Sequence, residues 1–180
     1  MTQLGLTNIV SRPHVTKSVT FHLSCIPPKT SHHAKRIVRI GKFSRLADKP
    51  ELVAAKNMLD ALLLPHQPTQ PIVGAVSLDV VYVWPWRASD GRRTRDRGLV
   101  PMTSRPDVDN LAKSLTDRLV ALRFIEDDSN VVELHVRKWW GGSPGITVTI
   151  SAIAPADQAK AVFRPPVFAS TAREGVTVNG

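Results

Sequence analysis

The chain has 180 residues, enough for one domain with a hydrophobic core and too few to make two domains the expectation. It carries 24 Lys and Arg against 15 Asp and Glu, a formal net charge of +9. This excess favours a polyanionic partner, with nucleic acid first and an anionic membrane second. Hydrophobic residues at 42% argue against disorder of the whole chain, and the single cysteine, Cys25, excludes an internal disulfide.

The sequence contains no long apolar span, and its first 17 residues lack the continuous apolar core of a signal peptide. We therefore expect a soluble, cytoplasmic protein with no membrane partner. We divide it into an N-terminal arm (1–17), one folded domain (18–154) and a C-terminal tail (155–180), where Pro, Ala and polar residues follow without periodicity.

The first half of the domain predicts a strand, a basic stretch and a helix. Residues 19–25 alternate apolar and polar side chains, which is the period of a half-buried strand. A polar, basic stretch follows over residues 29–49. Apolar residues then recur at helical spacing up to Pro65, with Asp48 as a candidate cap and Pro50 in the first turn.

A second strand and a long loop come next. Residues 74–84 predict a strand with its apolar side chains on one face. Residues 86–104 read as a loop, and loops of that length in a compact domain are usually functional or disordered. This arginine loop carries Arg87, Arg92, Arg93, Arg95 and Arg97.

The second half predicts a helix from about Asp109, with an apolar face of leucines, and then two strands at 132–136 and 146–150. The Gly- and Pro-rich residues 141–145 between those strands predict a hairpin connection. The element order β-α-β-α-β-β indicates an α+β fold, a two-layer mixed β-sheet packed with helices.

An acidic cluster surrounds the start of this helix. Asp107 and Asp109 are one residue apart, so in extended backbone both side chains would point the same way. Lys113 lies one helical turn beyond Asp109, and Asp127 and Asp128 follow the helix. Carboxylates without a cysteine or histidine set favour Mg²⁺ or Mn²⁺, ions that can promote phosphodiester cleavage.

Structural roles are the alternative for each of these residues. Asp109 could be a helix N-cap, worth roughly 1 kcal/mol, and Asp109 with Lys113 an ordinary surface ion pair of a few tenths of a kcal/mol. Asp127 and Asp128 fit a common helix-to-strand turn. This alternative leaves Asp107 unexplained and makes the acidic turn a coincidence.

The same residues resemble the RusA family of Holliday-junction resolvases, endodeoxyribonucleases common in bacteriophages and prophages. That family has an Asp-x-Asp-Asn-Leu-x-Lys run, a short helix, then Asp-Asp and a strand often beginning Val-Val. Here the run spans 107–113 and the second motif 127–132, with no gap needed between them. Residues 25–30 resemble the family's proline-containing DNA-binding loop, and the similarity covers about 19–150.

The resemblance implies an endonuclease that binds a four-way DNA junction as a homodimer and makes paired symmetric nicks. Asp107, Asp109 and Asp128 would be the catalytic carboxylates that bind Mg²⁺ or Mn²⁺. Lys113 would be the catalytic cation. The supporting residues would be Asn110 and Asp127, and the DNA-binding loop would hold Lys29, Thr30, Ser31 and His32.

The arginine loop is longer than the link expected from the family, and we predict that it contacts phosphates. The DNA-binding set therefore also includes Arg92, Arg93, Arg95, Arg97 and Arg105. Two other functions remain open: a flap or branched-DNA nuclease with the same metal site, and a non-catalytic DNA-binding module.

Overall fold

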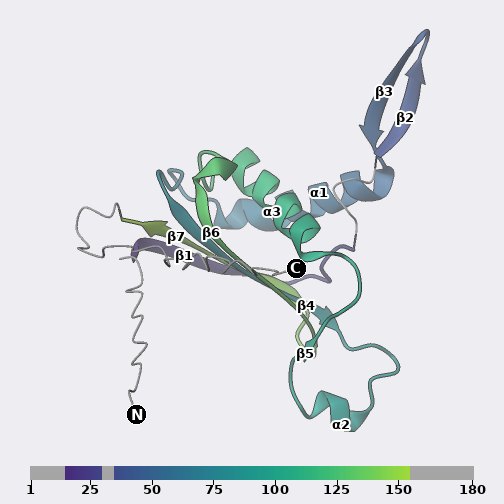
Figure 1. Cartoon of the computed structure of the whole chain (residues 1–180), viewed down its shortest axis with the longest axis vertical. Helices are drawn as coiled ribbons and strands as arrows, with labels where there is room; N and C mark the ends of the chain where they lie inside the picture. Colours follow the sequence, from purple (N-terminus) through teal and green to yellow (C-terminus); the bar gives the residue numbers. More distant parts are fainter. Residues whose placement is uncertain (1–14, 30–34, 155–180) are drawn as a thin grey trace, which may run out of the picture.

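A computed structural model describes residues 15–29 and 35–154 of the chain (Figure 1). A five-stranded sheet has the order β1-β7-β4-β6-β5, in which only the β4–β6 pair is parallel. The strands are β1 (Val15–Leu23), β4 (Val76–Pro85), β5 (Val100–Pro101), β6 (Val131–Gly141) and β7 (Gly145–Ile153). Most of the N-terminal arm (1–17) and all of the tail (155–180) that the sequence suggests lie outside the described residues.

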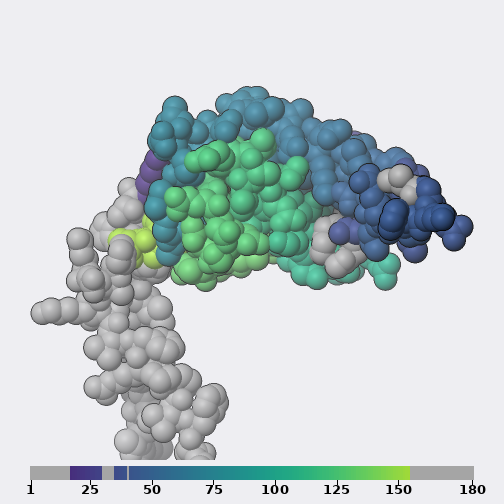
Figure 2. Space-filling view, turned by 90° about the horizontal axis from the view of Figure 1, so that it is seen from above, coloured from purple at the N-terminus to yellow at the C-terminus, as the bar shows by residue number. Residues whose placement is uncertain are grey.

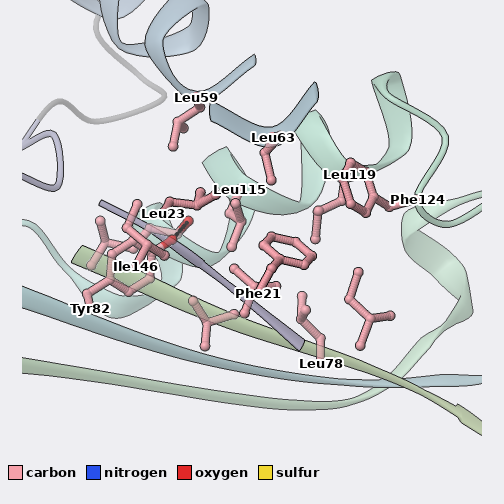
Figure 3. Close-up of a cluster of buried hydrophobic side chains, with 14 of the residues drawn as sticks. Phe21, Leu23, Leu59, Leu63, Leu78, Tyr82, Leu115, Leu119, Phe124 and Ile146 are labelled. Carbon is pink, nitrogen blue, oxygen red and sulfur yellow. Dashed lines mark hydrogen bonds between the residues drawn. The ribbon is translucent and has the colours of Figure 1, made fainter. Parts of the chain in front are cut away.

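Two fourteen-residue helices, α1 (Pro50–Leu63) and α3 (Val108–Ala121), lie on the same face of the sheet (Figure 1). Between the layers is the core, where Phe21, Leu78, Leu115 and Phe124 are among the buried side chains that face one another in Figure 3. The α+β class and the two-layer mixed sheet expected from the sequence are confirmed. None of the helices in the described part of the chain is long and apolar enough to cross a membrane.

The last two strands do not form the predicted hairpin. β6 and β7 both pair with β4, one on each side, and the turn between them carries the chain across the end of that central strand. The prediction was wrong because β4 is apolar on one face and half-buried on the other, with Val81 and Val83 there, which suits a strand with a neighbour on each side. A turn signal alone does not decide which strands pair.

The basic stretch and the arginine loop contain further elements. Residues 35–48 form a separate hairpin, β2 (Lys35–Ile40) and β3 (Phe43–Asp48), which extends away from the body beyond one end of α1 (Figure 1). The arginine loop contains the one-turn helix α2 (Arg92–Arg95) and the two-residue strand β5. The one-turn helices η1 (Leu64–His66) and η2 (Asp128–Asn130) follow α1 and precede β6.

Asp48 does not cap α1. It is the last residue of β3, and Lys49 takes the N-cap position without a side-chain hydrogen bond. Instead, the Asp48 carboxylate accepts a 2.6 Å hydrogen bond from Lys56. That contact ties the base of the hairpin to the second turn of α1.

Candidate active site

The acidic run begins at the N-terminus of α3. Asp107 is the N-cap residue, with extended backbone angles (φ −76°, ψ 153°), whereas Asp109 already belongs to the first helical turn. The two side chains are therefore not related by strand alternation, and the expectation that extended backbone aligns them was wrong. Both side chains are exposed, so they are accessible to a ligand from solvent.

Lys113 joins the two acidic motifs. Its ammonium lies 2.8 Å from a carboxylate oxygen of Asp128, 15 residues later in the chain, and 2.7 Å from one of Asp117. These two carboxylates, Asp117 first and Asp128 second, raise the pKa of Lys113 well above its usual range. The i,i+4 partner of Lys113 is thus Asp117, and not Asp109 as the structural alternative supposed.

The supporting residues lie beside this contact. Asp127 is the N-cap of η2 and accepts a 2.9 Å hydrogen bond from the backbone N–H of Ser129. Hydrogen bonds from Ser129 lower the pKa of the Asp127 carboxyl. Asp127 thereby orders the turn that presents Asp128 to Lys113, while half-buried Asn110 lies in the first turn of α3.

The donor atoms suit a hard divalent cation better than a soft one, because Asp107, Asp109 and Asp128 offer only carboxylate oxygens. Within residues 15–29 and 35–154, no three Asp, Glu, His or Cys side chains are grouped closely enough to hold one ion. The chemistry of the donors fits Mg²⁺ or Mn²⁺, but the described carboxylates are not arranged as a closed cage.

Two side chains that the sequence did not point to, Lys138 and Tyr82, fix the start of α3 through three hydrogen bonds. The half-buried Lys138 of β6 donates hydrogen bonds to the backbone carbonyls of Ser104 (2.6 Å) and Pro106 (2.7 Å), immediately before Asp107. From β4, the buried Tyr82 hydroxyl donates to the carbonyl of Leu111 at 3.2 Å. The acidic run is therefore anchored to two adjacent strands of the sheet.

A cluster of cations surrounds Trp140 near the end of β6. The Lys29 ammonium lies 5.4 Å from the centre of the indole ring, and the Arg87 guanidinium 5.5 Å. Trp84, at the end of the neighbouring β4, donates a 2.8 Å hydrogen bond to the carbonyl of Pro27. The proline-containing loop and the arginine loop therefore meet at this end of the sheet.

The arginine loop is held by a buried acid. Asp90 is only 6% exposed, and its carboxylate accepts hydrogen bonds from the Arg87 backbone N–H (2.9 Å) and guanidinium (2.8 Å). Arg95 donates to the Asp90 carbonyl at 2.8 Å. Exposed side chains in this region include Arg92, Arg93, Arg95, Arg97 and Arg105. The other predicted DNA contacts, Thr30, Ser31 and His32, lie outside the described residues.

Two curated proteins are similar to parts of this chain. The chain is 37% identical over 94 residues to the uncharacterized protein YqaN of Bacillus subtilis (strain 168), covering 49% of this chain and 66% of that protein. It is 53% identical over 36 residues to the crossover junction endodeoxyribonuclease rusA of Lactococcus phage r1t, covering 20% and 28%. The chain thus aligns with less than two thirds of either relative.

A family model gives the broader match. It is described as endodeoxyribonuclease RusA and matches residues 11–151, a range that includes β1, the acidic run, Lys113 and the Asp127–Asp128 turn. Because the match extends over most of the chain, the protein belongs to the RusA endodeoxyribonuclease family.

Proposed function

We propose that this protein is a divalent-metal-dependent, structure-specific DNA endonuclease that resolves four-way junctions by paired symmetric nicks. It acts as a homodimer on branched DNA in the cytoplasm of a bacterial host cell, and the protein is of phage or prophage origin. Residues 18–154 are the catalytic domain. A four-way junction has two-fold symmetry, and a C₂ dimer presents two equivalent sites to it.

The observation that carries the proposal is the 2.8 Å contact between Lys113 and Asp128. This contact joins the 107–113 run to the Asp127–Asp128 turn on an exposed surface. Asp107 and Asp109 lie one to two helical turns from Lys113 along α3. An ordinary surface ion pair accounts for Lys113 with Asp117. It does not account for a second acid from a distant turn on the same ammonium.

The proposed chemistry assigns each group a role. Asp107, Asp109 and Asp128 would hold Mg²⁺ or Mn²⁺, and the bound ion would polarise the phosphodiester and supply hydroxide. Lys113 would place a fixed positive charge beside the phosphate as negative charge develops on its oxygens. Asp127 orders the turn that carries Asp128, and Asn110 would support the site or the DNA backbone.

The proposed DNA contacts are cationic and lie on two loops. Lys29 and Arg87 are positioned by Trp140 through cation–π contacts, and the exposed arginines of residues 92–105 extend the positive surface. Each phosphate contact releases counterions, so binding should weaken steeply with added salt.

Cleavage of a labelled synthetic four-way junction in Mg²⁺ tests the proposal, with a linear duplex and a flap as comparison substrates. Wild-type protein should nick opposing strands of the junction symmetrically, and EDTA should abolish the products. Asp107→Asn should lower the rate by about a thousandfold or more while DNA binding persists, because it removes a metal ligand but no DNA-binding cation. Glu51→Gln, at an exposed acid in the first turn of α1, is the matched control and should cleave normally.

The outcomes separate the candidate functions. Preferential cleavage of the flap would identify the protein as a flap nuclease and contradict junction resolution. Binding without cleavage in either Mg²⁺ or Mn²⁺ would identify a DNA-binding module. Equal cleavage activity of the Asp107→Asn variant and the wild-type protein would show that Asp107 is not a metal ligand in the active site.

A further inference from the structure

The β2–β3 hairpin exposes apolar side chains that a stable domain would normally bury. Ile37 is 74% exposed, Leu46 69% and Phe43 83%. The hairpin is a separate two-stranded sheet, and Figure 2 shows it as the dark blue end of the molecule. An isolated two-stranded hairpin is at best marginally stable in water. Large apolar side chains exposed together commonly mark a surface that another molecule covers.

The register places the apolar and basic residues side by side. Ile37 pairs with Leu46, and the next pair toward the turn on the same face is Arg39 with Ser44. The opposite face carries Val38 paired with Arg45, followed toward the turn by Ile40 paired with Phe43. Each face of the ribbon therefore presents a cationic side chain next to an apolar one.

The charge of the hairpin distinguishes between occupants. Residues 35–48 carry five cationic side chains (Lys35, Arg36, Arg39, Lys42 and Arg45) and one acid. That acid, Asp48, is already paired with Lys56 of α1. A ribbon so rich in uncompensated positive charge would be repelled by a second copy of a chain with net charge +9, and attracted by a polyanion.

We infer that the β2–β3 hairpin is a DNA-binding arm that enters a groove of a duplex segment flanking the cleavage site. This inference rests on the proposed function and adds a contact surface to it. The major groove of B-DNA, about 12 Å wide, admits a two-stranded ribbon. Six residues per strand give the arm a length of about 20 Å, enough to cross that groove.

Within the groove, the two kinds of side chain have different partners. The cations contact phosphates along the groove edges, as Arg and Lys do in most protein–DNA interfaces. Ile37 and Leu46 face the base edges, where apolar side chains contact thymine methyl groups. The apolar pair is then covered by DNA, which accounts for its exposure in the free protein.

The variant Arg39→Gln/Arg45→Gln tests the arm. It keeps much of each side chain and removes two charges, so affinity for a four-way junction at 0.15 M salt should fall about tenfold or more. The slope of log affinity against log salt should become shallower by about 1.8, or about 0.9 per lost phosphate contact. Single-turnover cleavage at saturating DNA should be unchanged, because the acidic site is intact.

The control Lys17→Gln/Arg123→Gln removes the same charge from two exposed residues of the body. Equal affinities and salt slopes for this control and the hairpin variant would overturn the inference. If wild-type protein bound junctions but failed to cleave them, the proposed activity would fail while the arm could still be tested by binding. Circular dichroism and thermal melting establish that each variant is folded.

A second pair of variants separates DNA from a second protein copy. Ile37→Ser/Leu46→Ser should weaken DNA binding without changing the mass measured by sedimentation equilibrium. Loss of a wild-type dimer in this variant would assign the apolar pair to a protein interface and overturn the inference.

A tethered probe gives an independent reading of position. An iron–EDTA reagent attached to Lys42→Cys, in a Cys25→Ser background, should cut a duplex arm of the bound junction over a few adjacent nucleotides. Absence of cutting under conditions where the labelled protein is bound would place the turn of the hairpin away from DNA.

Discussion

The sheet-and-helix body and the β2–β3 hairpin both contain strands with large apolar residues, and the two regions differ in how far those residues are buried. Leu78 of β4 is 1% exposed, whereas Leu46 of β3 is 69% exposed. The body strand has a neighbour on each side and helices over one face, while the hairpin has two strands and no such layer (Figure 1). Large apolar side chains are therefore buried in the core of one region and exposed to solvent in the other, where we propose that they contact DNA.

The difference between the body and the hairpin indicates where substitutions can alter DNA binding without loss of the fold. The acidic run is attached to the body through Tyr82 and Lys138, so changes in the core should affect its position. The hairpin is tied at its base by the Asp48–Lys56 pair, so changes near its turn should affect binding and leave the body intact.

Matched leucine truncations should give the largest contrast. Leu115 of α3 is fully buried, and Leu115→Ala should lower the free energy of unfolding by about 3 kcal/mol through lost burial and a new cavity. That change corresponds to roughly 10 °C in Tm for a domain of this size. Leu46→Ala in the hairpin should cost less than about 0.5 kcal/mol.

Urea and thermal unfolding of the two variants measure this contrast. If Leu46→Ala were as destabilising as Leu115→Ala, the hairpin would be part of the cooperative core and the distinction between the regions would be lost.

A smaller effect is expected from Tyr82→Phe. This change removes only the hydroxyl that donates to the Leu111 carbonyl, so the free energy of unfolding should fall by about 1 kcal/mol. Urea denaturation would measure it. A reduced cleavage rate at saturating DNA, in a variant that stays folded at the assay temperature, would show that the hydroxyl also positions the acidic run.

The smallest effect concerns the arginine loop, where Asp90 is paired with Arg87. Hydrogen bonds from Arg87 lower the pKa of the Asp90 carboxyl below its ordinary 3.8. Because the folded-state pKa is the lower one, Asp90 contributes stability above about pH 4, and this contribution disappears as the pH falls through the folded-state value.

Thermal melts between pH 3 and pH 7 test this dependence. The Tm difference between wild-type protein and Asp90→Asn should be largest near neutral pH and should shrink toward pH 3. Arg87→Gln should reproduce the trend, since it removes the partner. A difference that stayed constant with pH would rule out the Arg87 contact as the source.

The sequence predicted the elements of the body because their periodicities reflect burial. The sequences of α3 and β4 each predict one apolar face, and in each element that face is buried. The β2–β3 hairpin was missed because its apolar residues are interspersed with arginines and lie in solvent, so they resemble a polar linker. Strand order was mispredicted at β6 and β7 because pairing depends on contacts between residues far apart in sequence.

For the candidate site, the sequence located the residue types and their spacing but not their contacts. The pairing of Lys113 with Asp117 followed the i,i+4 rule and could have been anticipated. The contact of Lys113 with Asp128, and the anchoring of Ser104 and Pro106 by Lys138, depend on how α3 lies against β6. That placement is a property of the tertiary fold. The metal-binding and DNA-binding roles stay predictions.

The pairing of β1 with β7 has a consequence for synthesis of the protein. The first described strand has β7 as its only neighbour in the sheet, through contacts such as Phe21 with Val148. During translation β1 is made before the rest of the domain. Its pairing edge and the core-facing side chains of Phe21 and Leu23 stay uncovered until β7, the last described strand, has been made. A chain that stops before β7 would leave two strand edges unpaired, on β1 and β4, so incomplete products should aggregate or be degraded.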